Sequence, residues 1–111
     1  MNSYNIPYII KLLSIIDRLH KKRVLVIQQL LEHVELGLEE QQPGGSIKLF
    51  CHCATFNRYL RLVRLHAPDG VASDPAPFRG ILRCFSEEAV RLIETYLEQV
   101  SPGILSEHAE L

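Results

Sequence analysis

Apolar residues recur every three or four positions along the first third of the chain, and positions 8–36 contain neither glycine nor proline. This spacing predicts amphipathic helix. A polar run at positions 20–23 interrupts it, so the pattern fits either two helices that meet there or one long helix of about 50 Å, at 1.5 Å per residue. Positions 24–27 (Val-Leu-Val-Ile) are locally typical of a strand, which leaves a short strand there as a third interpretation.

A segment with proline and two glycines, at positions 41–46, ends the helical pattern. Apolar and polar residues then alternate over positions 47–53, which predicts a strand. Positions 55–66 fit two structures. At helical spacing their apolar residues face one way and three arginines face the other, which favours a helix. The same residues would also suit the second strand of a hairpin.

Positions 67–77 hold three prolines, a glycine and two aspartates, and predict a loop. The short apolar segment that follows, at positions 78–85, is interrupted by Gly80 and predicts a strand. Ser86 can then cap a C-terminal helix whose first turn carries two glutamates at its positive end. A Pro-Gly pair at positions 102–103 ends that helix.

These elements together predict an α+β fold. We expect two N-terminal helices (or one long helix), a small antiparallel sheet of two to three strands, and a C-terminal helix packed on them, with an all-α fold as the alternative. At 111 residues the chain has the size of one domain. We assign residues 1–103 to a single globular domain and residues 104–111 to a flexible C-terminal tail.

The charges along the chain are arranged in blocks, although the net charge is only −1. Basic residues dominate positions 1–23 and 47–66, and acidic residues dominate positions 24–40 and 70–111. Blocks of this kind either satisfy each other within the fold or give the surface separate basic and acidic faces that steer partners.

The one cluster of metal-binding residue types is Cys51 and Cys53 with His66 and Cys84, a set that zinc would accept. Its C-x-C spacing is unusual for a zinc site, and buried free cysteines that behave as small apolar residues explain all three cysteine positions better. We therefore expect no metal and no cofactor. The odd number of cysteines favours a reducing compartment, cytoplasmic or nuclear. No apolar run is long enough to cross a membrane, and no catalytic constellation indicates an enzyme.

Two groups of basic residues could contact phosphate groups. The first is Arg18, Lys21, Lys22 and Arg23, and the second is Arg58, Arg61 and Arg64. Neutralising a nucleic-acid backbone needs no specific motif, so a nucleic-acid-binding regulatory protein is the alternative function. The chain matches no known nucleic-acid-binding signature, and its sequence pI of about 6.5 argues against this class.

The N-terminal half carries more apolar residues than one helix stripe requires, and excess apolar surface on helices often marks an interface. We therefore expect a small non-catalytic regulatory or adaptor protein that binds other proteins and forms a homodimer. A zinc-binding module or a small enzyme is the third possibility. An antiparallel pairing centred near Gln28 would place basic residues of one chain opposite Glu35 of the other. The interface candidates are Ile9, Leu12, Ile16, Leu19, Ile27, Leu30 and Val34.

Overall fold

The computed structural model describes residues 6–41, 53–70, 74 and 76–107, and within these ranges it contains helices and no strand. In chain order the helices are α1 (Ile6–Lys21), α2 (Ile27–Gln41), α3 (Cys53–His66), the 3-10 helix η2 (Ala76–Cys84), α4 (Glu87–Val100) and the short α5 (Ile104–Glu107). The predicted α+β fold is therefore wrong, and the all-α alternative fits the described part of the chain.

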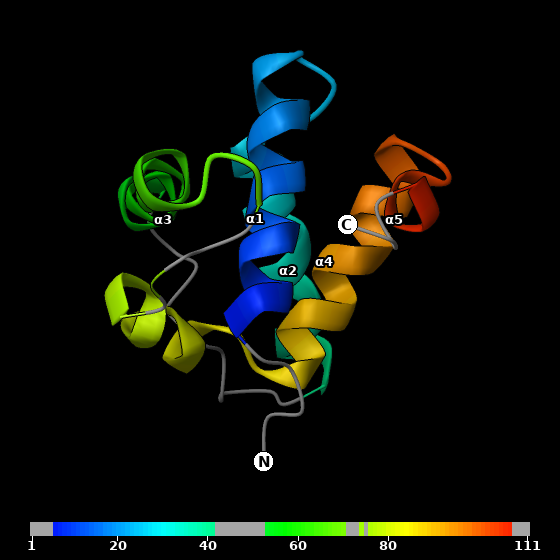
Figure 1. Cartoon of the computed structure of the whole chain (residues 1–111). Helices are drawn as coiled ribbons and strands as arrows, with labels where there is room; N and C mark the ends of the chain where they lie inside the picture. Colours follow the sequence, from blue (N-terminus) through cyan, green and yellow to red (C-terminus); the bar gives the residue numbers. More distant parts are fainter. Residues whose placement is uncertain (1–5, 42–52, 71–73, 75, 108–111) are drawn as a thin grey trace.

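α1 lies at the centre of the molecule, with α3 on one side and α4 on the other (Figure 1). α3 packs against α1, and α2 packs against α4. η2 contacts both α1 and α3, and α5 contacts α4. This central position explains why α1 is apolar around most of its circumference, because seven of its apolar residues are buried: Ile9, Ile10, Leu12, Leu13, Ile15, Ile16 and Leu19.

The strand predicted over positions 78–85 is helical in the structure. Among the side chains of this segment that the structure describes, Phe78, Ile81 and Phe85 are buried, and their spacing of three and four positions is a helical period. Arg79 and Gly80 between them are exposed. The Asp74 carboxylate accepts a hydrogen bond from the Ala76 N–H at 3.0 Å and so caps the start of η2. Of the other expected strand, positions 47–52 lie outside the described residues, and Cys53 begins α3.

The N-terminal helical pattern divides into two helices at a left-handed residue. Arg23 has a φ of 62°. The Val24 N–H bonds the Leu19 carbonyl at 2.9 Å, and the Arg23 N–H bonds the His20 carbonyl at 3.1 Å. These two bonds define a Schellman motif, in which glycine usually occupies the left-handed position. Arginine occupies it here, so no glycine marks the end of α1. The short strand considered for positions 24–27 does not form.

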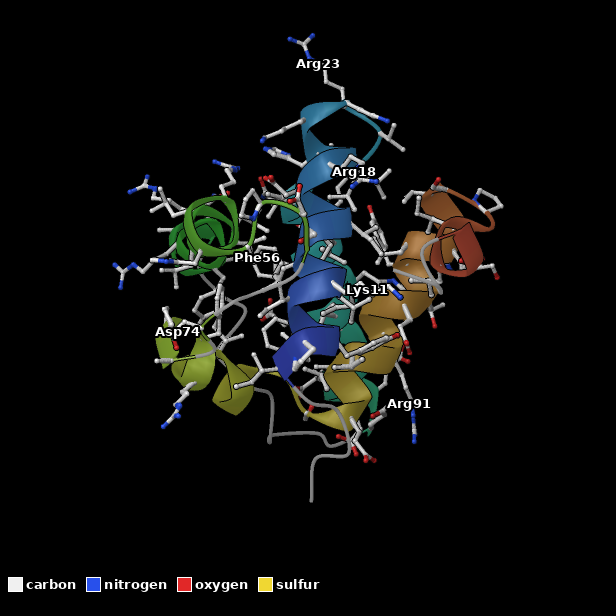
Figure 2. The ribbon with its side chains drawn as sticks, in the orientation of Figure 1. Lys11, Arg18, Arg23, Phe56, Asp74 and Arg91 are labelled. Carbon is white, nitrogen blue, oxygen red and sulfur yellow. The ribbon has the colours of Figure 1, made fainter. Side chains whose placement is uncertain are left out.

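α3 confirms the helical interpretation of positions 55–66. Phe56, Leu60 and Val63 are buried in one face, at helical spacing. Phe56 lies between α3 and α1 (Figure 2). Because Phe56 and Leu60 belong to the largest fully buried side chains of the described core, this face holds α3 in place.

The C-terminal helix forms as the sequence predicts. The Ser86 Oγ accepts a hydrogen bond from the Ala89 N–H at 3.2 Å, which is the geometry of an N-cap. Residues 104–107, expected as part of a tail, instead form α5, and Ile104 is buried. Both carboxylate oxygens of Glu98 accept backbone N–H bonds, from Gly103 and Leu105, each at 3.0 Å. These bonds fold the chain back onto α4.

α2 and α4 approach each other closely at Gly37. A Cβ atom at this position would overlap the side chain of Leu92 on α4, so the absence of a side chain permits the contact. α4 also contacts α1, because Tyr8 of α1 donates a hydrogen bond to Glu94 of α4. None of the described helices is both long enough and apolar enough to cross a membrane.

Candidate functional site

The seven predicted interface residues, Ile9, Leu12, Ile16, Leu19, Ile27, Leu30 and Val34, all lie in the core of a single chain. The most exposed of them is Leu19, at 5%. They pack against α3, η2 and α4 and cannot also contact a second chain while the fold is intact. An interface that involves α1 or α2 must therefore use other residues of these helices.

The first predicted basic group lies at the end of α1 and in the turn that follows. Arg18, Lys21, Lys22 and Arg23 are all exposed. Arg23 projects away from the body of the molecule at this end (Figure 2). Lysine and arginine in the last turn also stabilise a helix, because its carboxyl end carries a partial negative charge. The structure therefore brings this predicted group together on the surface.

The three arginines of the second basic group do not have the same role in the fold. Arg58 and Arg61 are exposed on α3, but Arg64 is engaged within the chain. Its Nη2 donates to Asp17 Oδ1 at 2.6 Å, and its Nε donates to Asp17 Oδ1 and Oδ2 at 3.0 and 3.1 Å. One of the three arginines predicted to face a partner thus joins α3 to α1.

Asp17 is the only buried polar residue among the described residues, with 7% of its surface exposed. Lys21 Nζ lies 3.3 Å from Asp17 Oδ2, one helical turn further along α1. Burial raises the pKa of the Asp17 carboxyl, but the hydrogen bonds and positive charges of Arg64 and Lys21 outweigh that effect and hold its pKa below the ordinary value. Asp17 is therefore a permanent anion at neutral pH.

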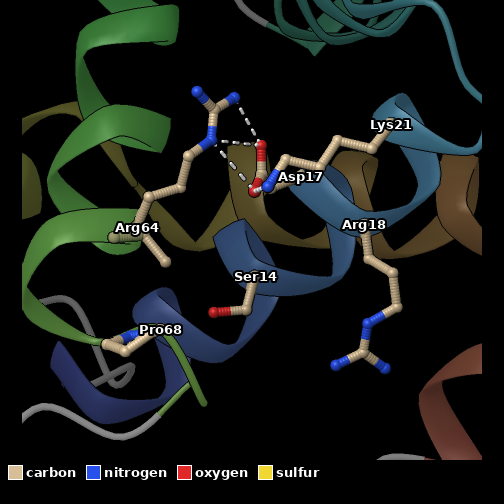
Figure 3. A pocket seen from close by; sticks show the side chains of 7 residues that line it. Ser14, Asp17, Arg18, Lys21, Arg64 and Pro68 are labelled. Carbon is tan, nitrogen blue, oxygen red and sulfur yellow. Dashed lines mark hydrogen bonds and ion pairs between the residues drawn. The ribbon is translucent and has the colours of Figure 1, made fainter.

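An open hollow of about 310 Å³ surrounds this pair (Figure 3). We call it the Asp17 hollow. Ser14, Asp17, Arg18 and Lys21 line it from α1, at three- and four-residue spacing that puts them on one helix face. Val63, Arg64 and Pro68 line it from α3 and the residues after it. The Ser14 Oγ is buried and has no hydrogen-bond partner among the described residues.

A second hollow, of about 430 Å³, lies on α2. It is lined by Glu32, Glu35, Leu36 and Glu39, which we call the α2 outer surface. Leu36 is 67% exposed at its centre, whereas the apolar residues on the opposite side of α2 are buried. An apolar side chain between three carboxylates can accept a segment that is both apolar and basic.

The predicted metal-ligand set is not assembled in the described part of the chain. His66 is exposed, and its ring meets the edge of Phe78 with 6.2 Å between ring centroids. Cys51 and the side chains of Cys53 and Cys84 lie outside the described residues. Within the described residues, no group of three or more histidine, cysteine, aspartate or glutamate side chains could hold a metal ion.

Sequence reasoning missed Ser14 and Asp17 as members of a site, although their spacing to Arg18 and Lys21 was a usable signal. His33 is half-buried against Tyr96, with 5.2 Å between the ring centroids, and its Nε2 is buried without a hydrogen-bond partner among the described residues.

Comparisons with known proteins add nothing to this geometry: no protein-family model, no curated protein and no solved structure matches the chain.

Proposed function

We propose that this chain is a small non-catalytic regulatory or adaptor protein that works by binding proteins, and that it self-associates through α2. The observation that carries the proposal is the exposed Leu36 among the carboxylates of the α2 outer surface. Three of the four large apolar side chains that are exposed in the described residues, Val24, Val26 and Leu36, belong to α2 and the turn before it. Exposed apolar side chains of this kind can contribute to an interface.

The charges before α2 and near its end would complement each other in an antiparallel pair. Exposed Lys22 and Arg23 stand before α2, next to exposed Val24 and Val26, and exposed Glu39 and Glu40 stand near its end. A twofold arrangement centred near position 31 brings Val26 of one copy to Leu36 of the other. The same arrangement brings the basic turn of one copy to the acidic end of α2 in the other. Isologous contacts of this kind are the commonest way in which small proteins pair.

The centre of this pairing differs from the one near Gln28 that the sequence suggested, because the buried apolar face of α2 is not available. The partner we propose is a second copy of the chain, and the compartment we propose is the cytoplasm or the nucleus. Three cysteines, an odd number, support that compartment, since a reducing environment keeps thiols free.

Sedimentation equilibrium at tens of micromolar tests the proposal. We expect a dimer for the unaltered chain, and a monomer for Leu36→Glu, which places a fourth acidic group on the α2 outer surface. Leu65→Glu is the matched control, because Leu65 is 69% exposed on α3, away from this surface. It should leave the dimer intact. A monomeric unaltered chain would refute self-association.

Charge exchange tests the antiparallel register. Lys22→Glu with Arg23→Glu should weaken self-association, and so should Glu39→Lys with Glu40→Lys, because each places like charges opposite each other. Mixing the two variants should restore a dimer, since one charge-complementary interface then forms between them. Failure of the mixture to associate, with both variants folded, would contradict the register.

A further inference from the structure

We propose that the outer side of α3 is a docking surface for an acidic amphipathic helix of a partner protein. Four exposed residues, which we call the α3 outer surface, lie along one line of this helix: Ala54, Arg58, Arg61 and Leu65. The inference rests on the proposed adaptor function, since it names a partner other than a second copy. It does not rest on self-association, which we assign to α2.

The α3 outer surface lies opposite the side of α3 that enters the core. Its four residues are spaced by four, three and four positions, so at 3.6 residues per turn they form one narrow stripe. The buried residues Phe56, Leu60 and Val63 lie about half a turn away from it. α3 lies at the outside of the molecule, and none of the described helices covers this stripe (Figure 1).

Leu65 supplies the apolar part of this surface. Its side chain is 69% exposed, more than any other large apolar side chain among the described residues. Leu62, three positions earlier, is half-buried and extends the apolar surface from Leu65 toward the core. A partner that packs on this line of α3 would remove apolar area from water at both leucines.

The charge of this surface is entirely positive. α3 contains neither aspartate nor glutamate. Arg58 and Arg61 are exposed, and neither forms an ion pair among the described residues, whereas Arg64 beside the stripe binds Asp17. Arg58 and Arg61 therefore present two guanidinium groups about one helical turn apart. Each can bind a carboxylate through two parallel hydrogen bonds.

The combination of leucine and arginines favours an acidic helix over a nucleic acid. An antiparallel helix with an apolar residue, followed four and seven positions later by glutamates, repeats the spacing of Leu65, Arg61 and Arg58. Its apolar residue would cover Leu65 while its glutamates pair with the arginines. A phosphate backbone would leave Leu65 in solvent, and two cations are few beside the roughly six to ten phosphate contacts of a typical nucleic-acid-binding protein.

Fluorescence anisotropy tests the inference with a labelled, alanine-based peptide of about 20 residues, a length that supports an isolated helix. The peptide carries a leucine and, four and seven positions later, two glutamates. We expect saturable binding with a Kd of roughly 10–100 micromolar, because one helix face is smaller than a standard interface. A control peptide with both glutamates moved to the opposite side should bind about fivefold more weakly or worse.

Arg61→Ala should weaken peptide binding about fivefold, as expected for the loss of one hydrogen-bonded ion pair. Leu65→Ala should weaken it by a similar factor, because less apolar area is then buried. Arg91→Ala is the matched control and should leave the affinity unchanged. It removes the same charge from an exposed position on α4, which lies on the other side of α1 (Figure 2).

Three results would overturn the inference. One is the absence of saturable binding up to about 1 mM peptide. Another is equal weakening by Arg61→Ala and Arg91→Ala, which would indicate attraction to net charge alone. The third is tighter binding to a DNA duplex than to the peptide near about 150 mM salt, which would identify a nucleic acid as the partner.

Sedimentation of one further variant separates this inference from self-association. Arg58→Glu with Arg61→Glu should abolish peptide binding and leave the dimer intact. A monomeric double variant would assign the α3 outer surface to a second copy of the chain and overturn the partner proposed here. Absence of peptide binding by a dimeric unaltered chain would refute this inference alone, and peptide binding by a monomeric chain would refute self-association alone.

Discussion

Arg64 and Asp17 are 47 positions apart in the sequence, yet Arg64 Nη2 lies 2.6 Å from Asp17 Oδ1. This pair joins α3 to α1, the two helices that form the Asp17 hollow. Arg64→Ala would leave a nearly buried carboxylate with only Lys21 beside it, so we expect the free energy of unfolding to fall by about 1–3 kcal/mol. Urea unfolding followed by circular dichroism measures this loss.

Arg61→Ala is the control for that measurement, because Arg61 is exposed on the same helix. It should change stability by less than about 0.5 kcal/mol, as surface substitutions usually do. Equal losses for the two arginines would show that the contact with Asp17 adds no stability.

The same pair predicts how stability depends on pH. The pKa of Asp17 is lowered in the folded state, so the folded chain binds fewer protons there than the unfolded chain. Its stabilising contribution is therefore complete above the unfolded pKa of about 4, and it is lost as the pH falls through the folded pKa.

We expect Asp17→Asn to reduce the acid sensitivity of stability below about pH 4.5, as measured by urea unfolding at a series of pH values. Part of the sensitivity should remain, because the backbone bonds from Gly103 and Leu105 also lower the pKa of Glu98. Asp69→Asn, at an exposed position after α3, serves as the control and should behave as the unaltered chain. An unchanged slope in Asp17→Asn would contradict the role assigned to its charge.

The left-handed Arg23 makes the turn between α1 and α2 a site for stabilisation. A non-glycine residue with a φ of 62° costs roughly 1 kcal/mol relative to glycine. Arg23→Gly should therefore raise the free energy of unfolding by about 0.5–1 kcal/mol, measured by thermal unfolding of dilute protein. Lys22→Gly, one position earlier, is the control and should give no gain. A loss of stability in Arg23→Gly would mean that the arginine side chain contributes more than its backbone costs.

The unpaired hydroxyl of Ser14 predicts that its removal stabilises the fold. Ser14→Ala removes a buried polar atom without a partner and improves helix propensity, so the melting temperature should rise by a few degrees. Ser106→Ala, at an exposed position in α5, is the control and should leave the melting temperature unchanged. A lower melting temperature in Ser14→Ala would show that the hydroxyl is satisfied in the folded chain.

The helices with strong periodicity could be predicted from the sequence, and the tertiary contacts could not. The Ser86 cap and the buried face of α4 follow from local spacing alone. η2 was mistaken for a strand because an apolar segment of eight residues is too short to separate the two periods. The end of α1 was ambiguous because arginine, not glycine, takes the left-handed position.

The candidate site required information that no local pattern contains. Arg18 and Lys21 were found as charges, but their shared face with Ser14 and Asp17 becomes a hollow only when α3 packs beside it. Likewise, the apolar residues chosen as an interface were those with the clearest periodicity, and periodicity marks the core. Leu36 lies outside the helical spacing of the buried residues of α2, so its side chain faces solvent.

Gly37 adjoins Leu36, and its contact with Leu92 constrains how the sequence of this protein can change. Because a larger residue at position 37 would occupy the space of the Leu92 side chain, the two positions should vary together among related chains, with a gain in size at one matched by a reduction at the other. A double-mutant cycle of Gly37→Ala and Leu92→Ala should accordingly show a coupling of about 1 kcal/mol. The residue pair that sets the spacing of α2 and α4 thus also limits the rate at which the neighbouring surface can diverge.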